Sequence, residues 1–410
     1  MKIKLPTALI QCIDKHISEE KDFFQIKEKQ KQLLNQKLIN LWYVIYSKQV
    51  EDNYKTLKFY TNIRSDDFRS FKFKFKSKTY QYNQLLYYLN NWGLIDINHI
   101  YCSKKGCNSF SKSYRIKTEF LCETEMTEVE IDFCKIFKNT RNMDYWLNKY
   151  PEYSNLITDC YNTTIKLDDF VNWLYNNSGK KLKDKMINGF LAKRYLTSER
   201  IIMYTNKALK LHFKNLWFKV SNEGRFYSSI TNLPSDSIEF LELYSKEIVE
   251  LDVSNCQPLL LASIIKNLEY KKDAENGVFY DKMAAKIGKK REVLKNFSYK
   301  YLFFSNKILK SGIIYKAINE CYPLLIEQIN NIKKQNKLSL VLQKMESSIF
   351  IEQIGKLPYP KITIHDSVLV QIEDYNFFKK MIENEFQKLD LKVSFKNDLK
   401  NENTLIFNQQ

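Results

Sequence analysis

Two short apolar segments that each carry an aspartate constrain this chain more than any other feature. The first, Glu247–Val253, contains Ile248, Val249, Leu251 and Val253, which predict a strongly apolar, buried strand. Pro258 and the apolar run at 259–265 predict a helix that begins immediately afterwards, because proline is tolerated in a helix's first turn. Asp252 is therefore predicted at the end of a strand beside a helix N-terminus, where a buried carboxylate needs compensation. The alternative interpretation is that Asp252 is an edge residue or caps the turn.

The second segment is Lys361–Val370, in which apolar residues flank a central His365-Asp366-Ser367. This pattern predicts a β-hairpin with Asp366 at its tip. His365 is one of only four histidines in the chain. Ordinary turn chemistry is the alternative explanation of the His-Asp pair.

Between these segments, two cations and two aromatics recur at intervals of four residues. Steps of four advance about 40° around a helix, so these side chains share one slowly turning face. Cations followed by aromatic rings suit a triphosphate and a stacked base. A plain basic surface helix is the alternative in so lysine-rich a chain. The four residues are Arg291, Lys295, Tyr299 and Phe303.

A Gly224-Arg225 pair precedes the first aspartate segment. Glycine lets another backbone approach closely, and arginine adds a forked hydrogen-bond donor. Alone this dipeptide is an ordinary turn. A helix predicted just before the second aspartate carries Gln343, Glu346 and Gln353, for which a solvated face is expected and a face toward the site is the alternative.

Taken in order, these motifs resemble those of the superfamily that unites family A DNA polymerases with phage-type single-subunit RNA polymerases. The resemblance covers about residues 222–410. Asp252 falls at the aspartate of motif A, and His365-Asp366 is similar to the His-Asp of motif C. The helix motif resembles motif B, and Gly224-Arg225 is similar to the arginine motif before the palm.

The resemblance implies a template-directed nucleotidyltransferase without a proofreading exonuclease. Two Mg²⁺ ions, which Mn²⁺ would replace, are then held by Asp252, Asp366 and the carbonyl of Val253. The remaining roles follow the family motifs. Arg291, Lys295, Tyr299, Phe303 and Gln257 would bind the nucleotide, Lys295 also taking part in catalysis, and Arg225 and His365 would bind the DNA primer–template.

The choice of sugar follows from single positions. Gln257 stands where the DNA branch carries a glutamate that excludes the 2′-hydroxyl, and its bulk favours deoxynucleoside triphosphates. Tyr299 also matches the DNA branch. Phe303 replaces the tyrosine of both branches, and Ser367 is similar to the RNA branch, so an RNA polymerase or primase is the alternative.

The predicted fold class is α+β, in three segments. Residues 223–410 form a palm with an antiparallel sheet and reduced helical fingers inserted at about 259–340, and 125–222 form a helical, thumb-like region. Residues 1–124 are expected to be helical at first and then similar to a winged helix. That last prediction rests on a helix at 81–89 closed by Gly93, a strand at 94–97, and β-like pieces at 99–102 and 113–117. A small α+β packing module is the alternative.

A net charge of +18 attracts polyanions and makes nucleic acid the leading partner. Part of the lysine-rich and tyrosine-rich composition reflects AT-rich codons. Cys102 and Cys107 lack a second ligand pair, so free cytosolic thiols are expected rather than zinc. No apolar run reaches membrane-spanning length, which predicts a cytoplasmic protein without a membrane partner. No protein partner is indicated.

Two other classes of function compete with the polymerase. A non-catalytic winged-helix replication initiator or regulator would retain the basic charge but would not need both aspartates. A phosphatase or nuclease would need the aspartates but not the basic-aromatic helix. Metal-dependent nucleotide incorporation on a primed oligonucleotide separates the three.

Overall fold

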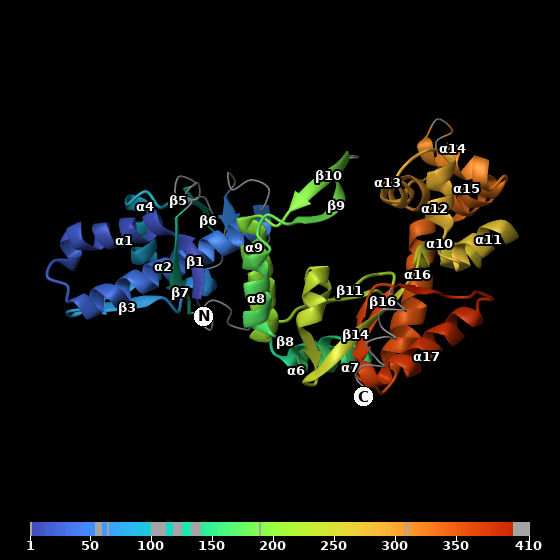
Figure 1. The fold of residues 1–410 in the computed structure, drawn as a ribbon. Coiled ribbons are helices and arrows are strands. Elements are labelled where there is room, and N and C mark those ends of the chain that lie inside the picture. Colours follow the sequence, from blue (N-terminus) through green and yellow to red (C-terminus); the bar gives the residue numbers. More distant parts are fainter. Residues whose placement is uncertain are drawn as a thin grey trace. The chain divides into compact units, whose positions relative to one another are not determined.

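The computed structural model describes residues 2–53, 60–63, 65–99, 112–117, 125–132, 141–187, 190–306, 308, 310 and 312–396 (Figure 1). It is an α+β protein in which every described strand pair is antiparallel, as the sequence predicts. The chain forms two compact units. Unit 1 comprises 1–140, 171–180 and 195–215, and unit 2 comprises 141–170, 181–194 and 216–410.

Unit 1 is built on two helices, α1 and α2, that pack on each other and bury a largely aliphatic and aromatic core. Strands β1 and β7 pair beside them, and β2, β6 and β5 form a second small sheet. The elements are β1 (Lys2–Pro6), α1 (Thr7–Glu19), η1 (Lys21–Phe23), α2 (Glu28–Asn53), β2 (Thr61–Asn62), α3 (Ser65–Phe68), β3 (Lys72–Phe75), β4 (Lys78–Gln81), α4 (Tyr82–Asn91), β5 (Ile95–Asn98), β6 (Ser113–Ile116), β7 (Met126–Glu130) and α9 (Ser198–His212).

The helix–strand–strand order predicted in unit 1 is present. Helix α4 ends before Gly93, whose φ of +72° is the left-handed conformation of a C-terminal cap. Strand β5 follows and pairs with β6. The cysteines Cys102 and Cys107 lie outside the described residues, as does most of the β-like piece at 99–102. The likeness to a winged helix stays a prediction.

Unit 2 contains the largest sheet, with strand order β15-β16-β14-β13-β8 and β17 paired to the end of β14. Its core contains Leu251 and Val253 of β14 and Val368 and Val370 of β16. Helix α17 contacts both of these strands, and α7 contacts β15. The strands are β8 (Thr163–Ile165), β9 (Lys181–Ile187), β10 (Phe190–Tyr195), β11 (Phe218–Val220), β12 (Phe226–Ser228), β13 (Leu241–Leu243), β14 (Lys246–Val253), β15 (Lys361–Ile364), β16 (Ser367–Gln371) and β17 (Phe395–Lys396).

Between β14 and β15 the chain is helical. Figure 1 shows α12, α13, α14 and α15 gathered in one group, and α10 lies against α16. The helices of the larger unit are α6 (Met143–Lys149), η3 (Pro151–Tyr153), α7 (Ser154–Tyr161), α8 (Leu167–Asn176), η4 (Ile230–Asn232), η5 (Ser235–Phe240), α10 (Cys256–Ala262), α11 (Leu268–Glu275), α12 (Phe279–Lys286), α13 (Arg291–Phe297), η6 (Ser298–Phe303), α14 (Ile313–Cys321), α15 (Leu325–Gln335), α16 (Leu338–Ser347), η7 (Ser348–Gln353), η8 (Ile354–Lys356), η9 (Ile372–Asp374) and α17 (Tyr375–Gln387), of which α8 continues into unit 1.

The segment 125–222, predicted to be mostly helical, also contains strands β7 to β11 and is divided between the two units. Its strands are interspersed with helices α6 to α9. The helical periodicity that predicted a helical region holds only for parts of the segment. Within the described residues, no helix is both long and apolar enough to cross a bilayer.

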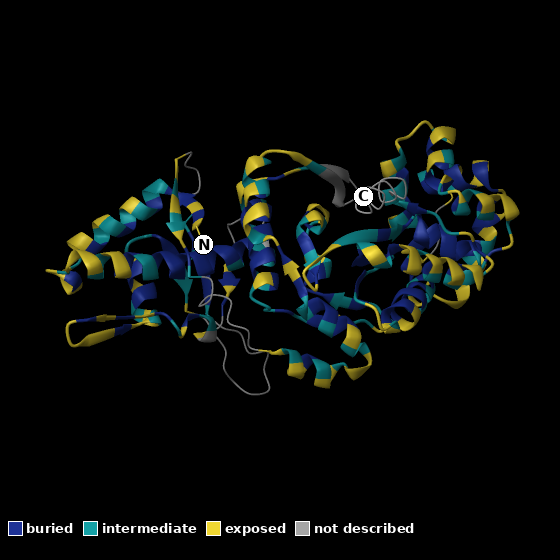
Figure 2. Ribbon diagram, turned by 60° about the horizontal axis from the view of Figure 1, so that its bottom comes forward, coloured by how far each residue is buried: buried dark blue, intermediate teal, exposed yellow. Residues whose placement is uncertain are grey.

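Burial follows the layers of unit 2. Figure 2 shows buried residues in dark blue inside unit 2 and many exposed, yellow residues on its helices. Val368, Leu369 and Val370 of β16 are fully buried, at 0% exposure. This central strand is therefore apolar on both faces, while polar side chains are confined to its ends.

Candidate active site

Asp252 is the penultimate residue of β14, which ends at Val253. Two turn residues follow, and helix α10 then begins at Cys256 with Pro258 in its first turn. Asn255 makes the reversal in the left-handed conformation, at φ +51°. The predicted order of strand, turn and helix is therefore confirmed, and it places a carboxylate beside a helix N-terminus.

Asp366 lies in the two-residue turn that joins β15 to β16, as predicted. Ile364 pairs with Ser367, which leaves His365 and Asp366 as the loop. His365 has a φ of +55°, and tight hairpins need such a residue because its twist matches that of the strands.

The sheet brings the two aspartates together. Asp252 pairs with Ser367, the neighbour of Asp366, and the backbone N–H of Val253 donates to the carbonyl of Asp366 at 3.2 Å. Two residues far apart in the sequence thus share one end of two adjacent central strands.

The two oxygens of the Asp252 carboxylate differ. Oδ2 accepts a hydrogen bond from Nζ of Lys396 at 2.6 Å, whereas Oδ1 is buried and has no hydrogen-bond partner. Burial raises the pKa of Asp252, Lys396 opposes the rise, and the charge of Asp366 adds to it. An orphaned buried carboxylate oxygen is costly, and a cation would satisfy it.

A third carboxylate, Glu250, lies two residues before Asp252 and hence on the same face of β14. Burial raises its pKa, and the charge of Asp252 raises it further. The sequence predicts Glu250 only as part of the strand. Its spacing of two residues from Asp252 is the signal that could have placed it at the site.

The cations of the basic-aromatic motif lie on α13, and one of them, Lys295, is influenced by the charges of both aspartates. Burial lowers the pKa of Lys295, Lys396 and Arg291 lower it further, and the charges of Asp366 and Asp252 oppose this. The guanidinium of Arg291 donates through Nε to Asp281 at 3.1 Å and through an NH2 group to Asn255 at 3.4 Å. Asn255 belongs to the turn after β14, so this pair of contacts ties α13 to the strand that carries Asp252.

A π-helical turn, Ser298–Phe303, follows α13. Tyr299 is half-buried, and burial together with the charge of Asp366 raises its pKa. The wider turn rotates the following residues, and Phe303 is 1% exposed, within the core. The ring centroids of Tyr299 and Phe303 are 5.9 Å apart, so the buried Phe303 packs against Tyr299. Phe303 is not itself available to a ligand at the surface.

Arg225 is paired with a residue that sequence analysis placed in solvent. Its guanidinium donates to Glu346 at 2.6 Å, and Nε2 of Gln257 donates to the same oxygen at 2.5 Å. Burial raises the pKa of Glu346, while Arg225 lowers it. The expected solvated face is therefore wrong for Glu346, which is 2% exposed, because α16 packs against α10 and turns this carboxylate inward.

The other two residues of that predicted face lie differently. Gln343 is half-buried and Gln353 is exposed. A π-helical turn, Ser348–Gln353, separates Gln353 from α16 and changes the phase of the helix. Helical spacing alone could not show this.

His365 lies against the Gly224-Arg225 element. Its ring meets that of Tyr227 edge to face, with centroids 5.3 Å apart. Burial lowers the pKa of His365, and the nearby charge of Arg225 lowers it further. Gly224 has a φ of +83°, a left-handed conformation that glycine adopts without strain, whereas a Cβ there would make only ordinary van der Waals contact with Cβ of Ser347 at 3.4 Å.

Polar atoms without partners concentrate around these residues. Five of the buried side-chain atoms that lack a hydrogen bond in the described chain belong to this one region. Native interiors rarely leave such groups unsatisfied, so the region is suited to a polar ligand or to ordered water. The five are Nε of Arg225, Oδ1 of Asp252, Oε1 of Glu346, Oγ of Ser347 and Nδ1 of His365.

The residues fit a Mg²⁺ site of the kind that relies on substrate. Among the described residues, no cluster of three or more His, Cys, Asp or Glu side chains is arranged to enclose a metal. Mg²⁺ commonly takes only one or two carboxylates and completes its shell with water and substrate phosphates. Asp252, with its unpartnered oxygen, and Asp366 supply such a pair.

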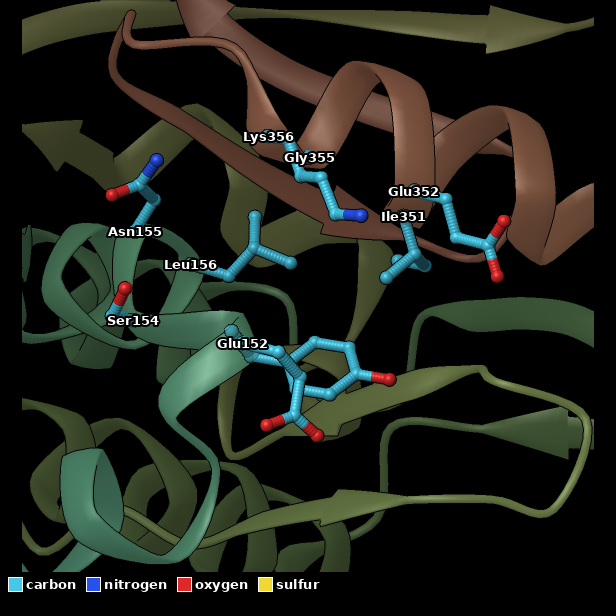
Figure 3. A pocket seen from close by; sticks show the side chains of 9 residues that line it. Glu152, Ser154, Asn155, Leu156, Ile351, Glu352, Gly355 and Lys356 are labelled. Atoms are coloured by element: carbon cyan, nitrogen blue, oxygen red, sulfur yellow. The ribbon is translucent and has the colours of Figure 1, made fainter.

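A separate pocket is lined by residues 152–156 and by residues of the helical turns η7 and η8 that follow Glu346. Figure 3 shows Leu156 of α7 and Ile351 of η7 facing one another across it, with Glu152 and Glu352 at its rim. None of the site residues lines this pocket. Comparison of the chain with protein-family models, with curated proteins and with solved structures finds no match.

Proposed function

We propose that this chain is a template-directed nucleotidyltransferase that extends a primer by two-metal-ion catalysis. The observation that carries the proposal is the convergence of Asp252 and Asp366 at one end of adjacent strands, where Asp252 keeps a buried oxygen without a partner. This supports the assignment to the polymerase superfamily because its motifs A and C require that juxtaposition. The sheet of unit 2 is then the palm, and α10 to α15 are reduced fingers.

The carboxylates would hold the two ions, with the carbonyl of Val253 as a further ligand. Bound Mg²⁺ supplies two effects, activation of the primer 3′-hydroxyl and stabilisation of the charge on the leaving pyrophosphate. Asp252 and Asp366 must both be ionised for this role.

The cations of α13 would bind the triphosphate. Lys295 is half-buried and lies within the influence of both aspartates, which suits a group that neutralises charge developing in the transition state. Arg291 is fixed by Asp281 and Asn255 and so is held ready for a phosphate oxygen. Tyr299, supported by Phe303, would stack on the base or sugar of the nucleotide.

The Arg225–Glu346 pair would lie beside the 3′ end of the primer. Arg225 and His365 approach one another from two segments and keep unsatisfied nitrogen atoms, which suit contacts with primer–template DNA. The net charge of +18 supports binding of nucleic acid in general.

Gln257 supports deoxynucleoside triphosphates as substrates. It is 7% exposed, and its hydrogen bond to Glu346 fixes the side chain. A bulky, fixed side chain beside the sugar leaves less room for a 2′-hydroxyl. The proposed product is therefore DNA.

The proposal is tested by extension of a labelled primer on a complementary template, with dNTPs and NTPs in parallel. Extension is expected with Mg²⁺, with Mn²⁺ in its place, and not after removal of metal by EDTA. Preferential incorporation of NTPs would contradict the choice of sugar. Incorporation that persists in EDTA, or none under any condition, would contradict the proposed reaction.

A further inference from the structure

Lys396 forms an ion pair with Asp252 of the proposed metal site and belongs to none of the motifs. It lies in β17, whose two residues pair with the end of β14, so that Lys396 is directly opposite Asp252. Its ammonium is 2.6 Å from Oδ2 of Asp252. The side chain of Lys396 is 37% exposed and that of Asp252 is 24% exposed, so the pair is accessible from solvent.

The charge of this ammonium acts on groups of both the sheet and α13. It opposes the rise in the pKa of Asp252, its ion-pair partner, and also of Glu250 on the same strand. It adds to the effect of burial that lowers the pKa of Lys295.

We propose that Lys396 competes with divalent metal for Asp252 and turns to the triphosphate when metal and nucleotide bind. This inference rests on the proposed function and adds to it a binding residue that the motifs lack. An ammonium on Oδ2 of Asp252 and a divalent cation at the unpartnered Oδ1 would be neighbours on one carboxylate and would repel one another. The displaced ammonium needs another anion, and the incoming triphosphate provides one.

Two consequences follow. Without nucleotide, metal binding is weakened, because the ammonium of Lys396 on Oδ2 repels an ion at Oδ1 and has no other anion to which it can turn. With nucleotide, the lost partner of Lys396 is replaced, so metal and nucleotide strengthen one another's binding. Lys396 thereby makes occupancy of the metal site depend on the presence of substrate.

The test measures Mn²⁺ binding to the full chain without nucleotide, by the electron paramagnetic resonance signal of the free ion. Lys396→Met is expected to bind Mn²⁺ about five- to tenfold more tightly than the wild type, since it removes the competing cation. Lys396→Arg retains the charge and should stay within about twofold of the wild type. The matched control is Lys246→Met, which removes an exposed lysine at the other end of β14, where it pairs with Glu373 of η9. An unchanged or weaker affinity in Lys396→Met overturns the inference.

The variant Asp252→Asn separates this inference from the proposed function. Loss of Mn²⁺ binding in Asp252→Asn without a gain in Lys396→Met overturns only the role of Lys396. Undiminished binding in Asp252→Asn overturns the metal site and the proposed function with it. Circular dichroism checks folding, and Lys396→Gln replaces the methionine variant if the latter does not fold.

A kinetic measurement tests the second half of the inference. In primer extension, Lys396→Met should raise the KM for the nucleotide about five- to tenfold, because the triphosphate loses a cation. The kcat at saturating metal should change less than the KM. An unchanged KM would overturn the transfer of Lys396 to the triphosphate.

Discussion

Glu346 illustrates how a single buried charge organises this site. It is 2% exposed and holds Arg225 and Gln257, two residues from separate segments. A buried ion pair does not by itself show that the fold is stabilised. Removal of one partner is destabilising, however, because it leaves the other charge buried without compensation. Glu346 is therefore expected to be sensitive to truncation.

We predict that Glu346→Ala lowers the free energy of unfolding by about 3 kcal/mol, because Arg225 is left without its partner. Lys344→Ala, at an exposed position of the same helix, should change it by less than about 0.5 kcal/mol. Urea denaturation of both variants measures the difference. Equal effects of the two substitutions on the free energy of unfolding would show that the Arg225–Glu346 contact does not contribute specifically to stability.

The sequence predicted some site residues and missed others for a definite reason. Asp252 and Asp366 were recognisable because each lies inside its own local pattern, a strand before a helix and a hairpin turn. Lys396 and Glu346 were missed because their partners lie far away along the chain, at Asp252 and Arg225. Local periodicity shows which face a residue occupies and not what lies opposite.

At the scale of elements, the boundaries of strands and turns were predicted better than the phase of helices. The strand–helix junction at Asp252, the hairpin at Asp366 and the cap at Gly93 all follow from short-range sterics. The π-helical turns after α13 and α16 do not, because nothing in the sequence marks the inserted residue. Phe303, in the first of these turns, lies in the core, whereas Gln353, in the second, is exposed, as the sequence predicts.

The helix α13 provides a prediction about catalysis. Lys295 is half-buried near the aspartates, whereas Lys300, in the following turn, is exposed. Lys295→Met is expected to lower kcat/KM for nucleotide incorporation by about 100-fold or more, the usual loss for a group that stabilises transition-state charge. Lys300→Met should leave it within about threefold. Steady-state primer extension measures both, and similar values would argue against a specific role for Lys295.

At the scale of the whole molecule, stability at high pH depends on buried tyrosines. Tyr270 and Tyr280 are fully buried in unit 2, and burial raises the pKa of each well above 10. A raised pKa in the folded state gives stability that is complete below the unfolded pKa, near 10, and is lost as the pH rises above it.

We therefore predict that the free energy of unfolding falls as the pH rises from 9 to 11, by up to about 1.4 kcal/mol per pH unit for each such tyrosine. Tyr280→Phe should make this fall less steep, because one group that ionises only on unfolding is gone. Its hydroxyl has no hydrogen-bond partner, so the substitution should cost little at pH 7. Denaturation at several pH values measures the slope.

Two control variants accompany this measurement. Tyr270→Phe should flatten the pH dependence similarly but should also cost about 1 kcal/mol at pH 7, because the hydroxyl donates to the carbonyl of Pro258 at 2.8 Å. Tyr359→Phe, at an exposed position, should retain the wild-type slope. A slope that is the same in all three variants would contradict the account.

The central claim is that Asp252 and Asp366 hold the metal ions of a nucleotidyl-transfer site. Its most direct test is primer extension by Asp252→Asn and Asp366→Asn, measured together with binding of the same primer–template by fluorescence anisotropy. We predict that each variant loses extension by a factor of at least about 1,000 while its affinity for DNA stays within about threefold of the wild type. Extension at the wild-type rate by both variants would contradict the account.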